Sequence, residues 1–323
     1  MASLVLIHLY VLCIMAACNG CPNQCRCRNS RVKCHRIFGL PGRFPENTTK
    51  IAIDQSILEE IPVDAISGLP SLIAVEFTNC VISTISENAF SEMNSLRNLR
   101  FKNCSIDHIQ KHAFAYTGRR LKIEFLDSIV HYVHTFAFFD IHGANILNWK
   151  TTEICNLLPN AFYNVTGLKK LIFENCQMTI GNRAFGEIHA LQNLSISGTY
   201  FNTLACNGIT EILKAKTVQL SGNLINCDCG IEWISHEELK DSGSLRRFLQ
   251  TTTCARPMNF TSFTMETVLS EKRTWCNNEI RNVKTACFPK TSPKRLACGA
   301  STGNSDLFIW VLLAFRCLMT LSN

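Results

Sequence analysis

Hydrophobic residues recur along most of this chain at a nearly fixed interval of 24 positions. A first aliphatic residue is followed two and seven positions later by further large apolar side chains, and fifteen positions later, in most units, by phenylalanine. The first position holds Ile51, Val75, Leu99, Ile123, Leu147, Leu171, Leu194 and Val218, with one step shorter by a residue. This regularity indicates a solenoid, because no single unit can bury its own apolar side.

Each unit is expected to contribute one short strand. The first two apolar positions alternate with polar residues, which is typical of a half-buried strand. Strands of successive units should stack into a parallel sheet, with the later aliphatic residues and the phenylalanines filling the interior behind it. Val75, Leu99 and Ile123 should therefore lie side by side.

A small polar residue or cysteine follows each predicted strand, where the chain turns. The position holds Ser56, Cys80, Cys104, Ser128, Thr152, Cys176, Thr199 and Asn223. Because a buried turn leaves backbone groups in need of partners, these side chains are expected to form a hydrogen-bonding ladder. A redox or metal pair at Cys80 and Cys104, or a disulfide between them, is the alternative.

The repeat resembles the leucine-rich repeat, L-x-x-L-x-L-x-x-N/C-x-L, and SLRNLRFKNCSI at residues 95–106 fits it closely. The resemblance covers about residues 48–226, although Arg120, Ala144 and Ala215 occupy the leading leucine position. It implies an α/β solenoid, a horseshoe with short parallel strands on the concave face and irregular or 3-10 segments on the convex face. It also implies disulfide-bonded caps at both ends.

Cysteines flank the repeats on both sides. The pattern C-x3-C-x-C-x6-C at Cys21, Cys25, Cys27 and Cys34 is similar to the N-terminal cap of extracellular leucine-rich repeat proteins. That resemblance implies the bridges Cys21–Cys27 and Cys25–Cys34, whereas four cysteines alone allow three connectivities.

The second cysteine cluster begins with NCDCGIEWI and resembles the matching C-terminal cap. It implies the bridges Cys227–Cys254 and Cys229–Cys276, with a zinc site as the alternative. Cys155 and Cys206 have no evident partner, and Cys287 and Cys298 could close a small loop. Fifteen cysteines remain after removal of both chain ends, so one thiol should be free, buried or paired between molecules.

The chain ends indicate secretion and tethering. Residues 1–20 carry an apolar run of signal-peptide length followed by small residues, and eighteen cysteines in all suit an oxidising compartment. The tail, residues 307–323, is short for a membrane span and follows the small residues CGASTGNS. This pattern predicts a glycosylphosphatidylinositol signal with attachment at Gly299. A single transmembrane helix and a released soluble protein are the alternatives, since Arg316 interrupts the tail.

The expected organisation of the chain follows from these features. It comprises a signal peptide (1–20), an N-terminal cap (21–47), leucine-rich repeats in about eight units (48–222), a C-terminal cap (223–276), a basic linker (277–306) and the tail (307–323). The net charge of +7 is partly due to the linker, and both signs are mixed elsewhere. No basic, aromatic-rich face for nucleic acid is evident.

Candidate chemistry is sparse. The histidines His108, His112, His131, His134 and His142 are expected at exposed positions rather than around zinc. No phosphate loop, nucleophile elbow or H-E-x-x-H motif is present, so we expect neither an enzyme nor a cofactor. Sequons predict glycans at Asn47, Asn103, Asn164, Asn193 and Asn259; Asn103 adjoins a buried turn, and a glycan at Asn193 would obstruct one end of the sheet.

The outward residues of the predicted strands are the candidate ligand site. They present mixed charge, with Leu126 and Ile172 interspersed, over Glu76, Arg100, Lys102, Glu124, Asn148, Lys150 and Glu174. Such a face suits a protein partner, because apolar contacts supply affinity and charges supply orientation. The sequence therefore predicts a surface-tethered extracellular recognition module for adhesion, guidance or immune recognition. A soluble secreted binder or inhibitor, or an enzyme's accessory subunit, is the alternative.

Overall fold

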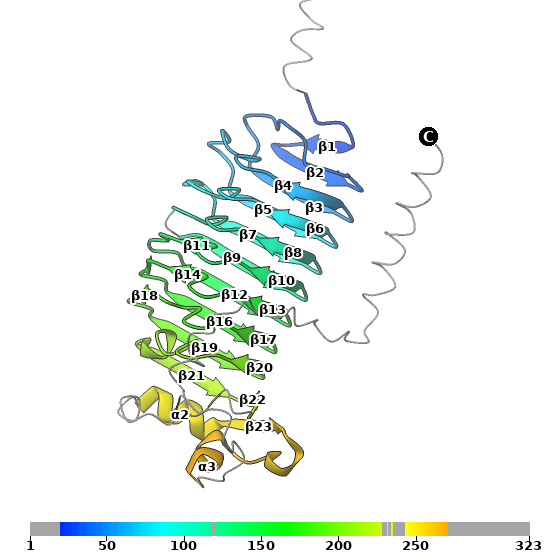
Figure 1. The fold of residues 1–323 in the computed structure, drawn as a ribbon. Helices are drawn as coiled ribbons and strands as arrows, with labels where there is room; N and C mark the ends of the chain where they lie inside the picture. The colour runs from blue at the N-terminus through cyan, green and yellow to red at the C-terminus, as the bar shows by residue number, and fades with distance from the viewer. Residues whose placement is uncertain (1–19, 118–119, 228–230, 232–233, 235–242, 271–323) are drawn as a thin grey trace, which may run out of the picture. The chain divides into compact units, whose positions relative to one another are not determined.

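The computed structural model describes residues 20–117, 120–227, 231, 234 and 243–270. The predicted signal peptide, Cys229, Cys276, the basic linker, Gly299 and the C-terminal tail lie outside these residues. Within them, the chain winds as a parallel β-solenoid whose strands lie one above the next (Figure 1).

The eight predicted strands and two strands of the N-terminal cap form a ten-stranded sheet, called the first sheet below. Its order is β1 (Cys25–Arg28), β2 (Arg31–His35), β3 (Lys50–Asp54), β5 (Ala74–Thr78), β7 (Asn98–Lys102), β9 (Lys122–Leu126), β12 (Ile146–Lys150), β16 (Lys170–Glu174), β19 (Asn193–Ser197) and β21 (Thr217–Ser221). Val75 is paired with Leu99, and Leu99 with Ile123, in parallel register. The predicted pairing of these three residues is confirmed.

A second sheet replaces much of the irregular and 3-10 structure that we expected outside the first. It contains β4 (Ile57–Ile61), β6 (Val81–Ile85), β8 (Ser105–Ile109), β10 (Ile129–Val133), β13 (Glu153–Leu157), β17 (Gln177–Ile180), β20 (Tyr200–Leu204), β22 (Asn223–Asn226) and β23 (Thr252–Arg256). Its strands are rich in isoleucine and valine, whose branched side chains favour extended backbone. The 3-10 helices include η1 (Ile212–Lys214) and η4 (Met258–Phe260).

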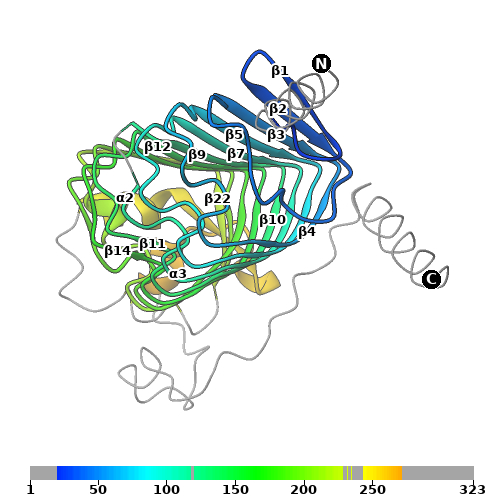
Figure 2. The ribbon, with the colours of Figure 1, turned by 90° about the horizontal axis from the view of Figure 1, so that it is seen from above.

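The third side of each turn carries only short strand pairs and loops. There β11 (Phe138–Phe139) pairs with β14 (Phe162–Tyr163), and β15 (Val165–Thr166) pairs with β18 (Ile188–His189). Figure 2 shows the successive turns from above, with the first and second sheets as two of the walls. The side of each turn that belongs to neither of these two sheets is called the third wall below.

Corners between the walls are made by residues in the left-handed region. Between the first and second sheets φ lies between 49° and 60° at Gln55, Asn79, Asn103, Asp127, Thr151, Asn175, Gly198 and Gly222. A second column of positive φ follows the second sheet at Asp64, Asn88, His112, Phe136, Asn160, Arg183 and Asn207. Asparagine, aspartate and glycine dominate these columns because they tolerate this conformation best.

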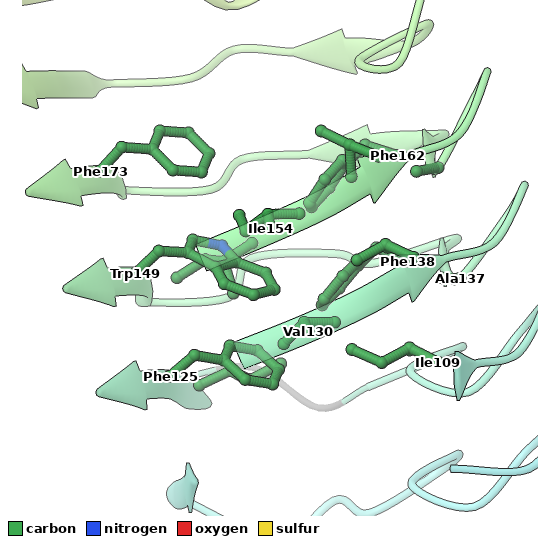
Figure 3. Packing of buried hydrophobic residues seen from close by; sticks show 14 of the residues in the cluster. Ile109, Phe125, Val130, Ala137, Phe138, Trp149, Ile154, Phe162 and Phe173 are labelled. Atoms are coloured by element: carbon green, nitrogen blue, oxygen red, sulfur yellow. The ribbon is translucent and has the colours of Figure 1, made fainter. Parts of the chain in front are cut away.

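Two columns of aromatic rings form the centre of the core. The rings two positions after each first aliphatic residue are stacked along the solenoid, as Phe101 and Phe125 show with centroids 5.0 Å apart. The phenylalanines of the third wall stack likewise, for example Phe138 on Phe162 at 4.5 Å. Edge contacts such as Phe138 to Trp149 at 6.3 Å join the columns (Figure 3). One continuous core therefore links all units, as the periodicity predicts.

Both ends of the solenoid carry disulfides. Cys21–Cys27 and Cys25–Cys34 close the N-terminal hairpin, and Cys227–Cys254 joins the end of β22 to β23. These are three of the four bridges implied by the resemblance, and the fourth lies outside the described residues. At the C-terminal end, α2 (Gly243–Thr251) places Phe248 against Phe201, with ring centroids 5.7 Å apart, and α3 (Met265–Ser270) contacts α2. The core is thereby covered beyond the last repeat.

Candidate functional site

The outer face of the first sheet brings the predicted ligand residues together. Alternate side chains along each strand point away from the core, because successive residues of a strand face opposite sides. Parallel register places them in rows: Glu76 lies beside Arg100, Arg100 beside Glu124, and Lys150 beside Glu174. All seven predicted residues occupy outward positions on strands β5 to β16.

Ion pairs connect the charged side chains across four strands. Glu76 accepts a 3.0 Å hydrogen bond from Lys50 and lies 3.6 Å from the Arg100 guanidinium. Arg100 donates to Glu124 at 2.8 Å, and Lys122 lies 2.9 Å from the same carboxylate. We refer to Lys50, Glu76, Arg100, Lys122 and Glu124 as the charge network. Its three cations and two carboxylates partly neutralise one another, so the electrostatic potential of the face is weaker than the number of charged residues indicates.

Glu124 is the centre of this network, with only 7% of its side chain exposed. Burial raises the pKa of this carboxyl, but hydrogen bonds from Lys122, Arg100 and Asn148 outweigh burial and hold its pKa below the ordinary value. The same carboxylate raises the pKa of Arg100. For Glu76, burial is likewise outweighed by Lys50 and Arg100, so its pKa is lowered too.

Three groups remain available to a partner on this face. Lys102 is exposed and makes no ion pair with any residue that the structure describes. Lys150 and Glu174 form a surface pair at 2.8 Å, which contributes little to stability. Leu126 is partly exposed between Lys102 and Lys150, and Ile172 is partly exposed beside Asn148. The arrangement offers apolar contact area beside a rigid network of charges.

The predicted ladder behind the first sheet is present. All eight side chains at the turn position are buried. Thr152 donates to the Phe125 carbonyl at 3.0 Å, and the Ser128 hydroxyl accepts the Cys104 amide at 3.1 Å. The ladder thus satisfies backbone groups that the turns would otherwise leave unpaired.

The cysteines of this ladder are buried thiols. Cys80, Cys104 and Cys176 are free, so the alternative of a disulfide between neighbouring rungs is wrong in this structure. Burial raises the pKa of Cys104 well above its ordinary value and that of Cys176 to about 11, which keeps both protonated at neutral pH. Protonated buried thiols are poor nucleophiles and metal ligands.

The expectation for two further cysteines needs correction. The sequence shows no evident partner for Cys155 or Cys206, yet both are disulfide-bonded. Both are also buried. Sequence spacing did not reveal this, because neither residue belongs to a cap pattern or to the ladder.

The histidines lie on the second sheet and the third wall. His131 Nδ1 lies 3.2 Å from the Asp107 carboxylate, which raises its pKa, whereas burial and the charge of His108 lower the pKa of His134. The His108 and His134 rings approach to 3.1 Å between nitrogens. In the described ranges no group of three or more histidine, cysteine or acidic side chains is arranged to hold a metal ion.

A partly exposed aromatic cluster on the third wall was not predicted. His112 packs on Phe139 with ring centroids 4.6 Å apart, Phe139 is stacked on Tyr163 at 6.1 Å, and Phe136 and Tyr116 contact the same group. Phe136 and Tyr116 have φ of 60° and 50°, which is unusual for bulky side chains. The signal in the sequence was aromatic residues at corner positions that other units fill with asparagine or aspartate.

All five sequon asparagines are at least partly exposed. Asn103 stands at a corner, where its side chain donates to Asn79 at 2.7 Å, and Asn193 begins β19 with a 3.2 Å bond to the Lys169 carbonyl. Among the helices of the described residues, none has the length and apolarity needed to span a bilayer.

Comparison with known families identifies the repeat. Residues 46–106 match the family "Leucine rich repeat", and residues 108–228 match the "BspA type Leucine rich repeat region" of six copies. The solenoid is a leucine-rich repeat domain. Such domains are protein-interaction modules rather than enzymes, in agreement with the prediction of a non-enzymatic protein.

The leucine-rich repeat domain is similar to part of a growth factor receptor. The NT-3 growth factor receptor of Homo sapiens is 30% identical over 96 residues, which is 29% of this chain and 11% of the receptor. The receptor of Gallus gallus is 30% identical over 108 residues, or 33% of this chain and 13% of the receptor. The match therefore spans only about a tenth of these receptors' length.

Two solved structures also match the chain. Human 5T4, a trophoblast glycoprotein, is 17% identical over 77% of this chain and 97% of its own, with a TM-score of 0.41. A chain from the complex of Latrophilin 3, Unc5D and FLRT2 is 17% identical over 76% of this chain and 97% of its own, with a TM-score of 0.31.

Proposed function

We propose that this protein is an extracellular recognition module that binds a protein ligand on the outer face of the first sheet. The observation that carries the proposal is the combination on strands β3 to β16 of a preorganised charge network with exposed Lys102 and partly exposed Leu126 and Ile172. Apolar contacts beside fixed charges give a protein partner both affinity and orientation. Adhesion, guidance and immune recognition are the functions that such a module serves.

Extracellular location is supported by the cysteine chemistry. Disulfides at both ends persist only in an oxidising compartment, and the first 20 residues read as a signal peptide. In that compartment the sequons at Asn47, Asn103, Asn164, Asn193 and Asn259 become glycosylation sites. We further propose that the chain is tethered by a lipid anchor attached at Gly299.

The ligand face can be tested with the full chain displayed on cells. Biotinylated tetramers of a library of extracellular proteins serve as the probes, and binding is read by flow cytometry. A tetramer captured by the wild type should bind about tenfold more weakly to Lys102→Glu/Lys150→Glu. The double variant should keep the wild-type circular dichroism spectrum, because both lysines lie outside the charge network. Its melting temperature should fall by only a few degrees, because Lys150→Glu exchanges the exposed pair with Glu174 for two like charges.

The matched control is Lys169→Glu/Lys216→Glu, which reverses two exposed lysines outside the central strands. It should bind the same tetramer as the wild type does. Equal binding by all three proteins would move the ligand site elsewhere, with the aromatic cluster of the third wall as the next candidate. Equal loss in both variants would reduce the interaction to unspecific charge attraction.

The tether is tested separately. Phosphatidylinositol-specific phospholipase should release the wild type, but not a fusion to a transmembrane helix, from the cell surface. Spontaneous accumulation of the wild type in the medium would instead support a soluble binder or inhibitor. Retention after phospholipase treatment would support a transmembrane helix.

A further inference from the structure

The N-terminal cap has a charge composition unlike the rest of the chain. Residues 21–45 contain no aspartate or glutamate, whereas their basic residues are Arg26, Arg28, Arg31, Lys33, Arg36 and Arg43. The first acidic residue after Cys21 is Glu46. Any ion pair within this segment is therefore excluded by its sequence.

Strand register gathers four of these cations on one surface. In the antiparallel hairpin of β1 and β2, Arg26 stands directly opposite Lys33 and Arg28 directly opposite Arg31. Residues directly opposite one another on paired strands point to the same side of the sheet. All four side chains are exposed. We call Arg26, Arg28, Arg31 and Lys33 the basic patch.

The basic patch continues the outer face of the first sheet but not its charge network. Arg31 is aligned with Lys50 of β3, and Lys33 with Ala52. Lys50 is already paired with Glu76, and His35 lies 3.3 Å from Asp54. None of the four patch residues forms an ion pair with any described residue. Ion pairing of the lysines and arginines therefore ends at β3, and the surface of β1 and β2 keeps an excess of positive charge.

This arrangement is unfavourable for the isolated protein. Like charges directly opposite one another destabilise a strand pair. Two disulfides hold the hairpin nevertheless, because Cys25–Cys34 links directly opposed residues and Cys21–Cys27 ties β1 to the preceding segment. Covalent closure fixes the two strands that carry the cations, whose backbones lie about 4.8 Å apart. The patch is therefore preorganised for an anion that the protein does not itself supply.

We propose that the basic patch binds a sulfated polysaccharide of the heparin class. Three of the four side chains are arginine, whose planar fork holds tetrahedral or planar oxyanions by two parallel hydrogen bonds. A row of cations at regular spacing suits a linear chain with repeated sulfates. The outward positions of β1 and β2 contain no apolar residue, whereas protein interfaces are usually anchored by aromatic or aliphatic side chains. The biological relevance rests on the proposed extracellular location, but binding itself does not.

Binding is measured with purified full-length protein and immobilised heparin over a series of NaCl concentrations. The test variant is Arg26→Gln/Arg28→Gln/Arg31→Gln/Lys33→Gln, because serine at position 31 would create a glycosylation sequon at Asn29. The negative slope of log affinity against log salt should become shallower by about three to four, because the variant lacks four cations and close to one counterion is released per cation that contacts a polyanion. The control Lys169→Gln/Lys170→Gln/Arg183→Gln/Lys216→Gln removes the same charge from exposed positions elsewhere and should keep the wild-type slope.

Stability provides the second readout. Since the test variant removes like-charge opposition, it should melt at the wild-type temperature or above. A lower melting temperature would show that the four side chains stabilise the cap, which contradicts an unneutralised patch.

Comparison of heparin with other polyanions identifies the chemical class of ligand that the patch binds. Hyaluronan, which has carboxylates but no sulfates, should bind at least about tenfold more weakly than heparin does. The proposal fails if the two variants lose heparin equally, or if the wild type does not bind heparin at 0.15 M NaCl. Patch-dependent binding to phosphatidylserine vesicles without heparin binding would assign the patch to a membrane surface instead.

Discussion

At the scale of the residue, the repeat depends on corner positions that the hydrophobic pattern does not include. The corner between the two sheets requires φ near 50°, and most units place asparagine, aspartate or glycine there. Asn103 shows the added benefit of asparagine, because its side chain donates to Asn79 of the preceding unit at 2.7 Å. Gln55 and Thr151 are exceptions, and Thr151 has a β-branched side chain at φ 49°.

Replacement of Thr151 by asparagine should therefore stabilise the domain. Left-handed backbone costs an ordinary side chain about 1–2 kcal/mol, and asparagine bears less of this cost. We expect Thr151→Asn to raise the free energy of unfolding by about 1 kcal/mol in urea titrations. The reverse change at an equivalent corner, Asn175→Thr, should lower it by a similar amount. A destabilised Thr151→Asn would show that the threonine makes a compensating contact.

At the scale of the element, neighbouring strands of the first sheet are joined by charge as well as by backbone hydrogen bonds. Several of these contacts follow directly from the repeat, because Arg100 and Glu124, like Lys150 and Glu174, are 24 positions apart. The recurrence of opposite charges 24 positions apart was the signal in the sequence that could have predicted these ion pairs. The outward residues were predicted, but their mutual pairing was not. Pairing changes their role, since Arg100 and Glu124 support the sheet as well as presenting a surface.

Glu124→Gln should weaken the domain in a pH-dependent way. The folded pKa of Glu124 lies below its ordinary value of 4.5, so its contribution is present above that pH and is lost as pH falls through the folded pKa. At pH 7 the variant should unfold with about 1–3 kcal/mol less free energy than the wild type. The difference should narrow steadily as the pH is lowered below 4.5 in urea titrations.

Glu174→Gln provides the comparison for this prediction. Its carboxylate pairs with Lys150 at 2.8 Å, but 39% of the Glu174 side chain is exposed. An exposed pair of this kind contributes less than about 1 kcal/mol. Equal effects of the two substitutions, or a Glu124 effect that persists unchanged at pH 3, would show that the charge network does not stabilise the sheet.

At the scale of the whole molecule, each unit contacts only its neighbours, so stability is transmitted along the core and limited at the ends. Cys227–Cys254 ties the last repeat strand to the segment that covers it, over a sequence separation of 27. Closing a loop of this length removes about 3–4 kcal/mol of unfolded-state entropy in the chain-entropy description. The C-terminal cap should therefore protect the final repeats more than the central ones.

Removal of this bridge should cause local opening. In Cys227→Ser/Cys254→Ser, we expect amide hydrogen exchange to accelerate in β20, β21 and β22, while β5, β7 and β9 keep wild-type protection. Mass-spectrometric exchange on the full chain measures both regions together. Uniform acceleration throughout would show that the solenoid unfolds as one cooperative unit rather than from its end.

Features that recur at the repeat interval could be predicted from the sequence. The order of strands, the register of Val75 with Leu99 and the ladder at Ser128 all repeat every 24 residues. A fixed interval places equivalent residues of successive units side by side, so the spacing along the sequence is enough to predict which residues are neighbours. The second sheet was not predicted, because the resemblance to leucine-rich repeats implies irregular or 3-10 segments there, although its strands are rich in isoleucine and valine.

Other features depend on contacts that no interval encodes. Arg26 meets Lys33 because the chain reverses direction within the cap, and charge averaged over the sequence concealed that encounter. The cluster of Phe136, Phe139 and Tyr163 combines rings from different corners and strands of successive turns. The linear sequence thus specifies the stacking of the repeats, because that stacking is periodic. The surfaces available for binding arise only when the folded chain brings non-equivalent positions together, because side-chain charge and exposure depend on every neighbour in space.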